Sequence, residues 1–341
     1  MVNSSEFCPS MKLKALKAIE HIKSFLVLAM IAVALTVIPL SPPVSAQPLN
    51  SWSSTTSYPT GIANQSCVTN SGFIYCVGGN SPSPTSAVFF APITSSGVGP
   101  WASTTPYGSA PTVPAGVPIA EQSCVTDSGF IYCVGGGTNL VFFAPISSSG
   151  VGTWASTNSY PVPIERESCV TNSGFIYCVG GFDGSTAVSN VRFAPISSSG
   201  VGTWASTNSY PSTILEQSCV TNSGFIYCVG GSSPSPTSDV RFAPISSSGV
   251  GSWTSTNSYP FSITEQSCVA RASFVFCVGG LSFPIGLTSD VFFAPISSSG
   301  VGTWTSTNSY PFPIFEQSCV TRASLIYCVG GNSGTSAVFF G

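Results

Sequence analysis

The sequence predicts an all-β protein built from six repeated units. Self-similarity begins after Pro48, and a tryptophan returns about every fifty residues. The six tryptophans are Trp52, Trp101, Trp154, Trp204, Trp253 and Trp304. Between them lie β-branched and aromatic runs of four to six residues, bounded by Gly, Pro, Ser and Asn, with no helical period. A period of this length with four short strands is typical of a propeller blade, so we expect a six-bladed β-propeller.

Each unit is expected to contribute four antiparallel strands. In the first repeat they fall at 65–69 (QSCVT), 73–79 (FIYCVGG), 87–92 (AVFFAP) and 101–107 (WASTTPY). The last repeat ends after its third strand, and residues 51–58 (SWSSTTSY) precede the first repeat as an extra fourth strand. We expect this N-terminal strand to pair with the last blade, because closure removes the open sheet edges.

The repeated unit resembles the kelch repeat. It has a hydrophobic run ending in Gly-Gly, an aromatic third strand and a Trp on the fourth, and these recur six times across residues 51–341. The resemblance implies that the first strand of each blade lies innermost. Two features depart from the family pattern: paired cysteines are added, and the Arg common before the first strand is mostly Glu here.

Residues 1–46 are predicted to be a signal peptide, with Met11 as a possible alternative start. Lysines precede an apolar run at 25–38, and the small-x-small sequence "VSA" ends at Ala46. Fourteen residues span about 21 Å as a helix, against roughly 30 Å of bilayer hydrocarbon. Cleavage is therefore favoured over a membrane anchor, and contact with a membrane is expected only if this segment is uncleaved. The propeller is expected to span 47–341.

Removing the signal peptide changes the available chemistry. It holds all four Lys and the one His, His21. The remaining chain has five Arg against ten Asp and Glu, a net charge of about −5, so nucleic acid is a poor candidate partner. The copper site of galactose oxidase-like propellers needs His ligands, and a sialidase-like site needs three Arg, whereas only Arg166 falls near the expected active end.

The cysteine pairs are predicted to be disulfides. A zinc site usually has cysteines two to four residues apart, and a redox pair favours Cys-x-x-Cys, but Cys67 and Cys76 enclose eight residues. With Ser71-Gly72 as a two-residue hairpin loop, Cys67 faces Cys76 in a close pair, about 4.5 Å between Cα atoms. A four-residue loop would keep the same partners and reverse the type of pair. The predicted bonds are Cys67–Cys76, Cys124–Cys133, Cys169–Cys178, Cys219–Cys228, Cys268–Cys277 and Cys319–Cys328. They fit a secreted or cell-surface protein.

A candidate binding site lies where the repeats differ. The loops from second to third strand and from fourth to next first strand vary most, and both lie at one end, here called the variable face. Just before each first strand stands a residue of what we call the mouth ring, expected around the central channel. Its members are Asn64, Glu121, Arg166, Glu216, Glu265 and Glu316. Four carboxylates there suit Ca²⁺ or a polar ligand, or they bond neighbouring blades' backbones in a structural role; no other cofactor is expected.

The sequence favours a non-catalytic, exported binding or scaffold protein that recognises a protein or glycan through the variable face. The alternative is a carbohydrate-active hydrolase or lyase that uses glutamates of the mouth ring. Equivalent Glu residues in four blades indicate a duplicated structural position, whereas an acid and a base are expected in unlike environments.

Overall fold

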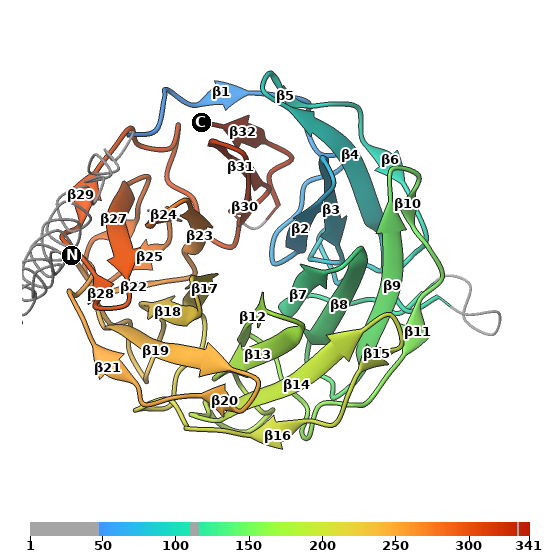
Figure 1. The fold of residues 1–341 in the computed structure, drawn as a ribbon. Coiled ribbons are helices and arrows are strands. Elements are labelled where there is room, and N and C mark those ends of the chain that lie inside the picture. The colour runs from blue at the N-terminus through green and yellow to red at the C-terminus, as the bar shows by residue number, and fades with distance from the viewer. Residues whose placement is uncertain (1–47, 110–115, 333) are drawn as a thin grey trace, which may run out of the picture. The chain divides into compact units, whose positions relative to one another are not determined.

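The computed structural model describes residues 48–109, 116–332 and 334–341, and it is built of strands. Six blades, each an antiparallel sheet, surround a common centre, and inner strands of neighbouring blades lie against one another (Figure 1). The predicted signal peptide lies outside the described residues. Within the described part, no helix is long and apolar enough to cross a membrane.

Each blade follows the predicted strand order. The first, innermost strands are β2 (Ser66–Asn70), β7 (Gln122–Asp127), β12 (Ser168–Asn172), β17 (Ser218–Asn222), β23 (Ser267–Arg271) and β30 (Ser318–Arg322). The second strands are β3 (Phe73–Val77), β8 (Phe130–Gly135), β13 (Phe175–Val179), β18 (Phe225–Val229), β24 (Phe274–Val278) and β31 (Leu325–Val329). The third strands are β4 (Val88–Thr94), β9 (Val141–Ser147), β14 (Val191–Ser197), β19 (Val240–Ser246), β27 (Val291–Ser297) and β32 (Val338–Phe340).

The outer part of each blade is made of very short strands. The fourth strands are β6 (Ala102–Ser103), β11 (Ala155–Ser156), β16 (Ala205–Ser206), β21 (Thr254–Ser255), β29 (Thr305–Ser306) and, for blade 6, β1 (Ser53–Ser54). In blades 1 to 5 the end of the third strand folds back onto β5 (Gly97–Val98), β10 (Gly150–Val151), β15 (Gly200–Val201), β20 (Gly249–Val250) or β28 (Gly300–Val301). Blade 5 adds a small sheet of β22 (Ile263–Thr264), β25 (Leu281–Ser282) and β26 (Gly286–Leu287).

The first two strands of each blade form the predicted disulfide-linked hairpin. In blade 1 Asn70 pairs with Phe73, and Ser71 and Gly72 both have positive φ, as a type I′ turn requires. All six predicted disulfides are present, with 4.0–4.1 Å between Cα atoms, slightly below the expected spacing. Six intrachain bonds of this kind indicate an oxidising environment.

The hydrophobic core is divided among the six interfaces between blades. Tyr75 and Val77 of blade 1 pack in one cluster with Ile131 of blade 2. An equivalent cluster joins Tyr327 of blade 6 to Ile74 of blade 1. The second strand of each blade is buried on both faces because each sheet contacts two neighbours, which explains its continuous hydrophobic run.

The ends of the propeller meet as predicted. Strand β1 pairs antiparallel with β32, with Ser53 opposite Phe340, and the inner strand β2 lies against β30. The N-terminal strand therefore completes blade 6.

The fourth strands are shorter than predicted, since only Ala102–Ser103 of the expected 101–107 pairs with β4. The next residue, Thr104, turns to blade 2, where its hydroxyl donates to the Val151 carbonyl (3.1 Å) and accepts from the Val151 N–H (2.9 Å). Tyr107 packs edge-on against Trp154, 5.0 Å between ring centroids. The backbone of this segment nevertheless stays beside its own blade, since the N–H of Thr104 donates to the Val88 carbonyl (3.0 Å) and that of Tyr107 to the Ser86 carbonyl (2.8 Å). Its side chains, by contrast, bind the neighbouring blade.

Candidate functional site

The six residues of the mouth ring form a closed circle of backbone hydrogen bonds. The N–H of each donates to the carbonyl of the mouth-ring residue in the preceding blade, over 3.0–3.2 Å, and Asn64 closes the circle by donating to Glu316. All six have φ between 56° and 61°, a left-handed conformation that is uncommon outside glycine. The circle of backbone hydrogen bonds holds these residues in the left-handed conformation. The position therefore accepts any residue type that can adopt a positive φ.

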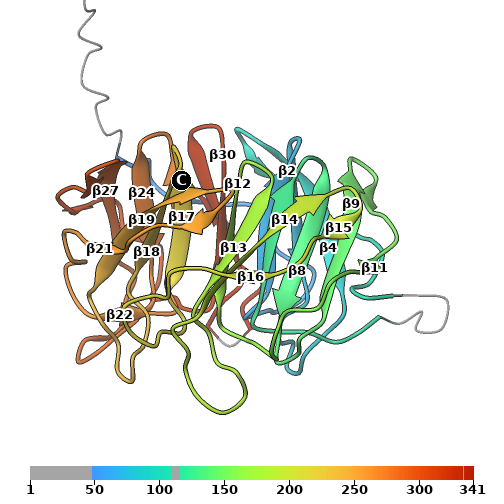
Figure 2. The ribbon, with the colours of Figure 1, turned by 60° about the horizontal axis from the view of Figure 1, so that its bottom comes forward.

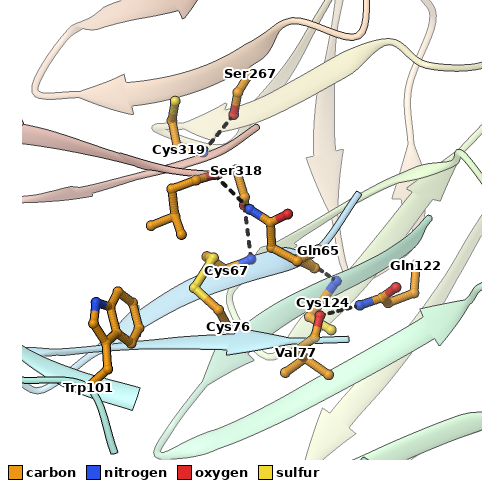
Figure 3. The surroundings of a disulfide bond; sticks show 12 residues. Gln65, Cys67, Cys76, Val77, Trp101, Gln122, Cys124, Ser267, Ser318 and Cys319 are labelled. Atoms are coloured by element: carbon orange, nitrogen blue, oxygen red, sulfur yellow. Dashed lines mark hydrogen bonds between the residues drawn. A yellow bond between two sulfur atoms is a disulfide. The ribbon is translucent and has the colours of Figure 1, made fainter. Parts of the chain in front are cut away.

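The residue after each mouth-ring position forms a second set of links between blades. Five of these residues are buried glutamines whose Nε2 donates to a valine carbonyl of the preceding blade over 2.6–2.7 Å, as Figure 3 shows for Gln122 and Val77. They are Gln65, Gln122, Gln217, Gln266 and Gln317. Glu167 takes the sixth position.

A third circle joins the serine and the cysteine that follow each of these positions. The backbone N–H of each first-strand cysteine donates to the hydroxyl of a serine in the preceding blade over 2.9–3.0 Å, as for Cys67 and Ser318 (Figure 3). Together the three sets bind every blade to its neighbour beside the mouth ring. These links between blades are made by backbone groups, glutamine amides and serine hydroxyls.

Arg166 joins two carboxylates of the mouth ring. Its guanidinium donates twice to Glu121, at 2.9 and 3.1 Å, and once to Glu216 at 2.9 Å. These bonds, those to Glu121 above all, hold the pKa of Arg166 above its ordinary value. The Thr264 hydroxyl donates to the other oxygen of Glu216 over 3.0 Å.

Glu265 stands in a different environment from these paired carboxylates. Burial, and then the negative charges of Glu216 and Glu316, raise the pKa of Glu265 to about 7. Its Oε2 is buried and has no hydrogen-bond partner in the described part of the chain. Glu165, beside the ring, also has a raised pKa, because of burial and then the charge of Glu121. The mouth ring therefore combines ion-paired carboxylates with one that takes up a proton near neutral pH.

All six mouth-ring residues and the six residues that follow them line one pocket of about 160 Å³. A second pocket of about 250 Å³ shares Glu121 and extends to Glu165, Pro84 and Ile119 on the variable face. The structure thus brings the predicted residues to one place. Among the residues described, no group of three or more His, Cys, Asp or Glu side chains is placed to hold a metal ion.

The variable face also carries the exposed large apolar side chains of the described residues. Four belong to the hairpin formed by β25 and β26 in blade 5, here called the apolar hairpin, and the fifth is Leu140 in the corresponding loop of blade 2. At the tip Phe283 is 75% exposed and Ile285 is 61% exposed. The loops at this end extend beyond the strands at the lower edge of Figure 2.

Sequence reasoning missed the role of the buried glutamines. It also missed the threonine bridges, in which the hydroxyl of a Thr in one blade, such as Thr104, bonds both a backbone N–H and a carbonyl of the next blade. Gln recurs after the mouth-ring position in five of six repeats, and a Thr recurs three residues after each Trp, so repetition was an available signal. Their partners lie in other blades, however, and no spacing within one repeat identifies them.

The chain matches no protein-family model, and no curated protein matches it. Among solved structures it is similar to the structure of YjhT, with a TM-score of 0.66 and 11% sequence identity. That alignment covers 83% of this chain and 94% of the other. At this identity the likeness concerns the fold alone, and it agrees with the blades described above: the chain is a six-bladed β-propeller.

Proposed function

We propose that this chain is an exported, non-catalytic binding protein of the kelch type, and that its variable face recognises a ligand outside the cell or at its surface. The disulfides support an oxidising compartment, and the resemblance of the repeats supports the kelch assignment. The ligand is a protein or a glycan, and the apolar hairpin favours a protein.

The apolar hairpin is the observation that carries this proposal. Leu281 pairs with Leu287 across the hairpin, and Phe283 and Ile285 project at the turn between them. Segment 281–289 contains no charged residue. Exposed apolar groups gathered on one loop mark an interaction site. Side chains such as Phe and Ile contribute binding energy when they are buried in an apolar pocket of a partner protein.

The experiment is a binding screen of the purified protein against surface proteins and glycans, with and without Ca²⁺. A variant with Phe283→Ser and Ile285→Ser should lose on the order of tenfold or more in affinity for the partner found. Ser148→Asp, an exposed change at the opposite end of the propeller, should leave the affinity unchanged. Equal affinity of the hairpin variant and the wild type would overturn the assignment of this face, and a loss of binding in EDTA would place Ca²⁺ in the complex.

A second candidate is a glycan hydrolase or lyase acting at the mouth ring. It is favoured by the unlike environments of Glu265, whose pKa is raised, and Glu216, which is ion-paired with Arg166, since an acid and a base require such a difference. Turnover on a glycan panel that disappears in Glu265→Gln and in Glu216→Gln, with the fold intact, would replace the binding proposal by this one.

A further inference from the structure

One of the six blade interfaces holds a buried carboxyl group where the others hold an amide. Glu167 is only 6% exposed, and neither of its carboxyl oxygens has a hydrogen-bond partner among the described residues. It lies between blades 2 and 3 and lines the mouth pocket. A buried ionised carboxylate without a donor is strongly unfavourable, so this group needs an explanation.

The glutamines at the other five interfaces show what the position requires. Each donates Nε2–H to the carbonyl of the valine that precedes a Gly-Gly pair, for example Gln122 to Val77 over 2.7 Å and Gln217 to Val179 over 2.6 Å. The corresponding valine of blade 2 is Val134. A carboxylate has no hydrogen to donate to that carbonyl, whereas a carboxylic acid has one.

The Glu167 carboxyl group occupies the place of the glutamine amide. A methyl group built on Gly135 would lie 2.8 Å from Glu167 Oε2, and one built on the equivalent Gly78 would lie 3.1 Å from Gln122 Nε2. The side chain therefore reaches the same point beside the Gly-Gly pair, next to the carbonyl that the other blades satisfy.

We propose that Glu167 is a proton-dependent latch between blades 2 and 3: protonated, it donates its O–H to the Val134 carbonyl, and ionised, it releases that carbonyl. The step is a simple proton exchange with solvent, in which the O–H bond of the acid breaks and no other bond changes. It gives the binding surface of the proposed function a response to pH that the other five interfaces lack.

The surrounding charges support the neutral form of the latch. Burial raises the pKa of Glu167 to about 8, and the charge of Glu165 adds to the rise. The backbone N–H groups of Glu167 itself and of Ser123 lie near enough to offset part of it, although neither makes a hydrogen bond of good geometry to the carboxyl group. Tyr107 and Tyr160 also lie near the Glu167 carboxyl group. Burial and then the charge of Glu167 raise the pKa of both phenols, so both stay neutral over the pH range in which Glu167 titrates.

The latch adjoins the most highly charged part of the mouth ring. The preceding residue, Arg166, makes the ring hydrogen bond across the same interface, from its N–H to the Glu121 carbonyl (3.0 Å), and its side chain holds Glu121 and Glu216. Release of the latch loosens this interface. When Glu167 is ionised, the arrangement of the ion-paired side chains is expected to change. The affinity of the mouth ring for a ligand is expected to change with it.

Urea unfolding of the full protein at a series of pH values tests the latch, using Glu167→Gln, which restores the residue of the other blades. The folded-state pKa of Glu167 lies above the ordinary value of 4.5, so the contribution of this group to stability is fully present below about 4.5 and is lost as the pH rises towards about 8. Over that window the unfolding constant of the wild type should rise about tenfold per pH unit relative to Glu167→Gln, because one proton is linked to folding.

Two further measurements make the test decisive. Gln217→Glu installs a second carboxyl at an equivalent interface and should add the same pH dependence, which keeps the proposal testable even if Glu167→Gln does not fold. The infrared band of a protonated carboxyl group at pH 7 should be present in the wild type and reduced in Glu167→Gln. Parallel pH profiles for all three proteins, or an unchanged band, would overturn the latch. Neither outcome bears on the apolar hairpin, so the proposed function is tested separately.

Discussion

The threonine bridges between blades give a sharp quantitative prediction. The hydroxyl of Thr207 in blade 3 donates to the Val250 carbonyl of blade 4 (3.0 Å) and accepts from the Val250 N–H (2.8 Å). Val250 is only 4% exposed, so water does not replace a lost partner. Thr207→Val keeps the shape of the side chain and removes both bonds.

The expected cost follows from the two groups left unpaired. A buried donor or acceptor without a partner costs about 1–3 kcal/mol, so the two groups served by one hydroxyl should together cost about 2–6 kcal/mol of unfolding free energy. Thr203→Val, four residues earlier in the same segment, changes an exposed threonine in the same way and should cost less than about 0.5 kcal/mol.

Urea unfolding followed by tryptophan fluorescence measures both variants, since the tryptophans pack edge-on against buried tyrosines and report loss of blade packing. The midpoint should fall for Thr207→Val with little change in the slope m. A loss of stability in Thr207→Val no larger than that in Thr203→Val would show that the bridges do not stabilise the ring, and the reasoning would be wrong.

Three further predictions concern the disulfides and the mouth ring. An alkylating reagent should modify none of the twelve paired cysteines in the native protein and all twelve after reduction in denaturant, as read by intact mass; modification without reductant would contradict the pairing. Because the pKa of Glu265 is raised to about 7, its contribution to stability is present below about 4.5 and is lost as the pH rises through 7, so Glu265→Gln should flatten the stability profile in that window; an unchanged profile would refute the assignment. Arg166→Met should move the Glu265 titration, followed by carboxyl NMR, to higher pH because a neighbouring positive charge is lost; a downward shift would contradict this. The same change should alter stability by less than about 1 kcal/mol, because the Arg166 side chain is 41% exposed.

Most of the blade could be predicted from the sequence because its contacts are local. The two-residue turn at Ser71-Gly72 sets which residues face each other, and so the partner of Cys67 followed from counting. The pairing of β1 with β32 was predictable because the last repeat lacks a fourth strand and the first is preceded by one. The paired part of the fourth strand is shorter than predicted, and the side-chain contact of Thr104 with the next blade was missed, because a pattern read within one repeat does not show contacts between blades.

The candidate site was predictable in position and not in chemistry. The mouth-ring residues were found because they stand at one point of a repeat, and they do line one pocket. The repeat did not show that their backbones close a hydrogen-bonded circle, that Arg166 joins two of the carboxylates, or that Glu167 is buried against blade 2.

The sequence by itself determined the number of blades, the order of strands within each, the cysteine partners and the end of the propeller where the loops vary. These depend on turns and strand register over fewer than about fifteen residues, and the alternation of side chains encodes them directly. Only the tertiary structure decided which carboxylates pair with Arg166 and which carboxyl groups, those of Glu265 and Glu167, have a raised pKa and buried oxygens without a partner among the described residues. Those properties depend on charges and hydrogen bonds between residues about fifty positions apart, which closure of the ring brings together and on which burial then acts.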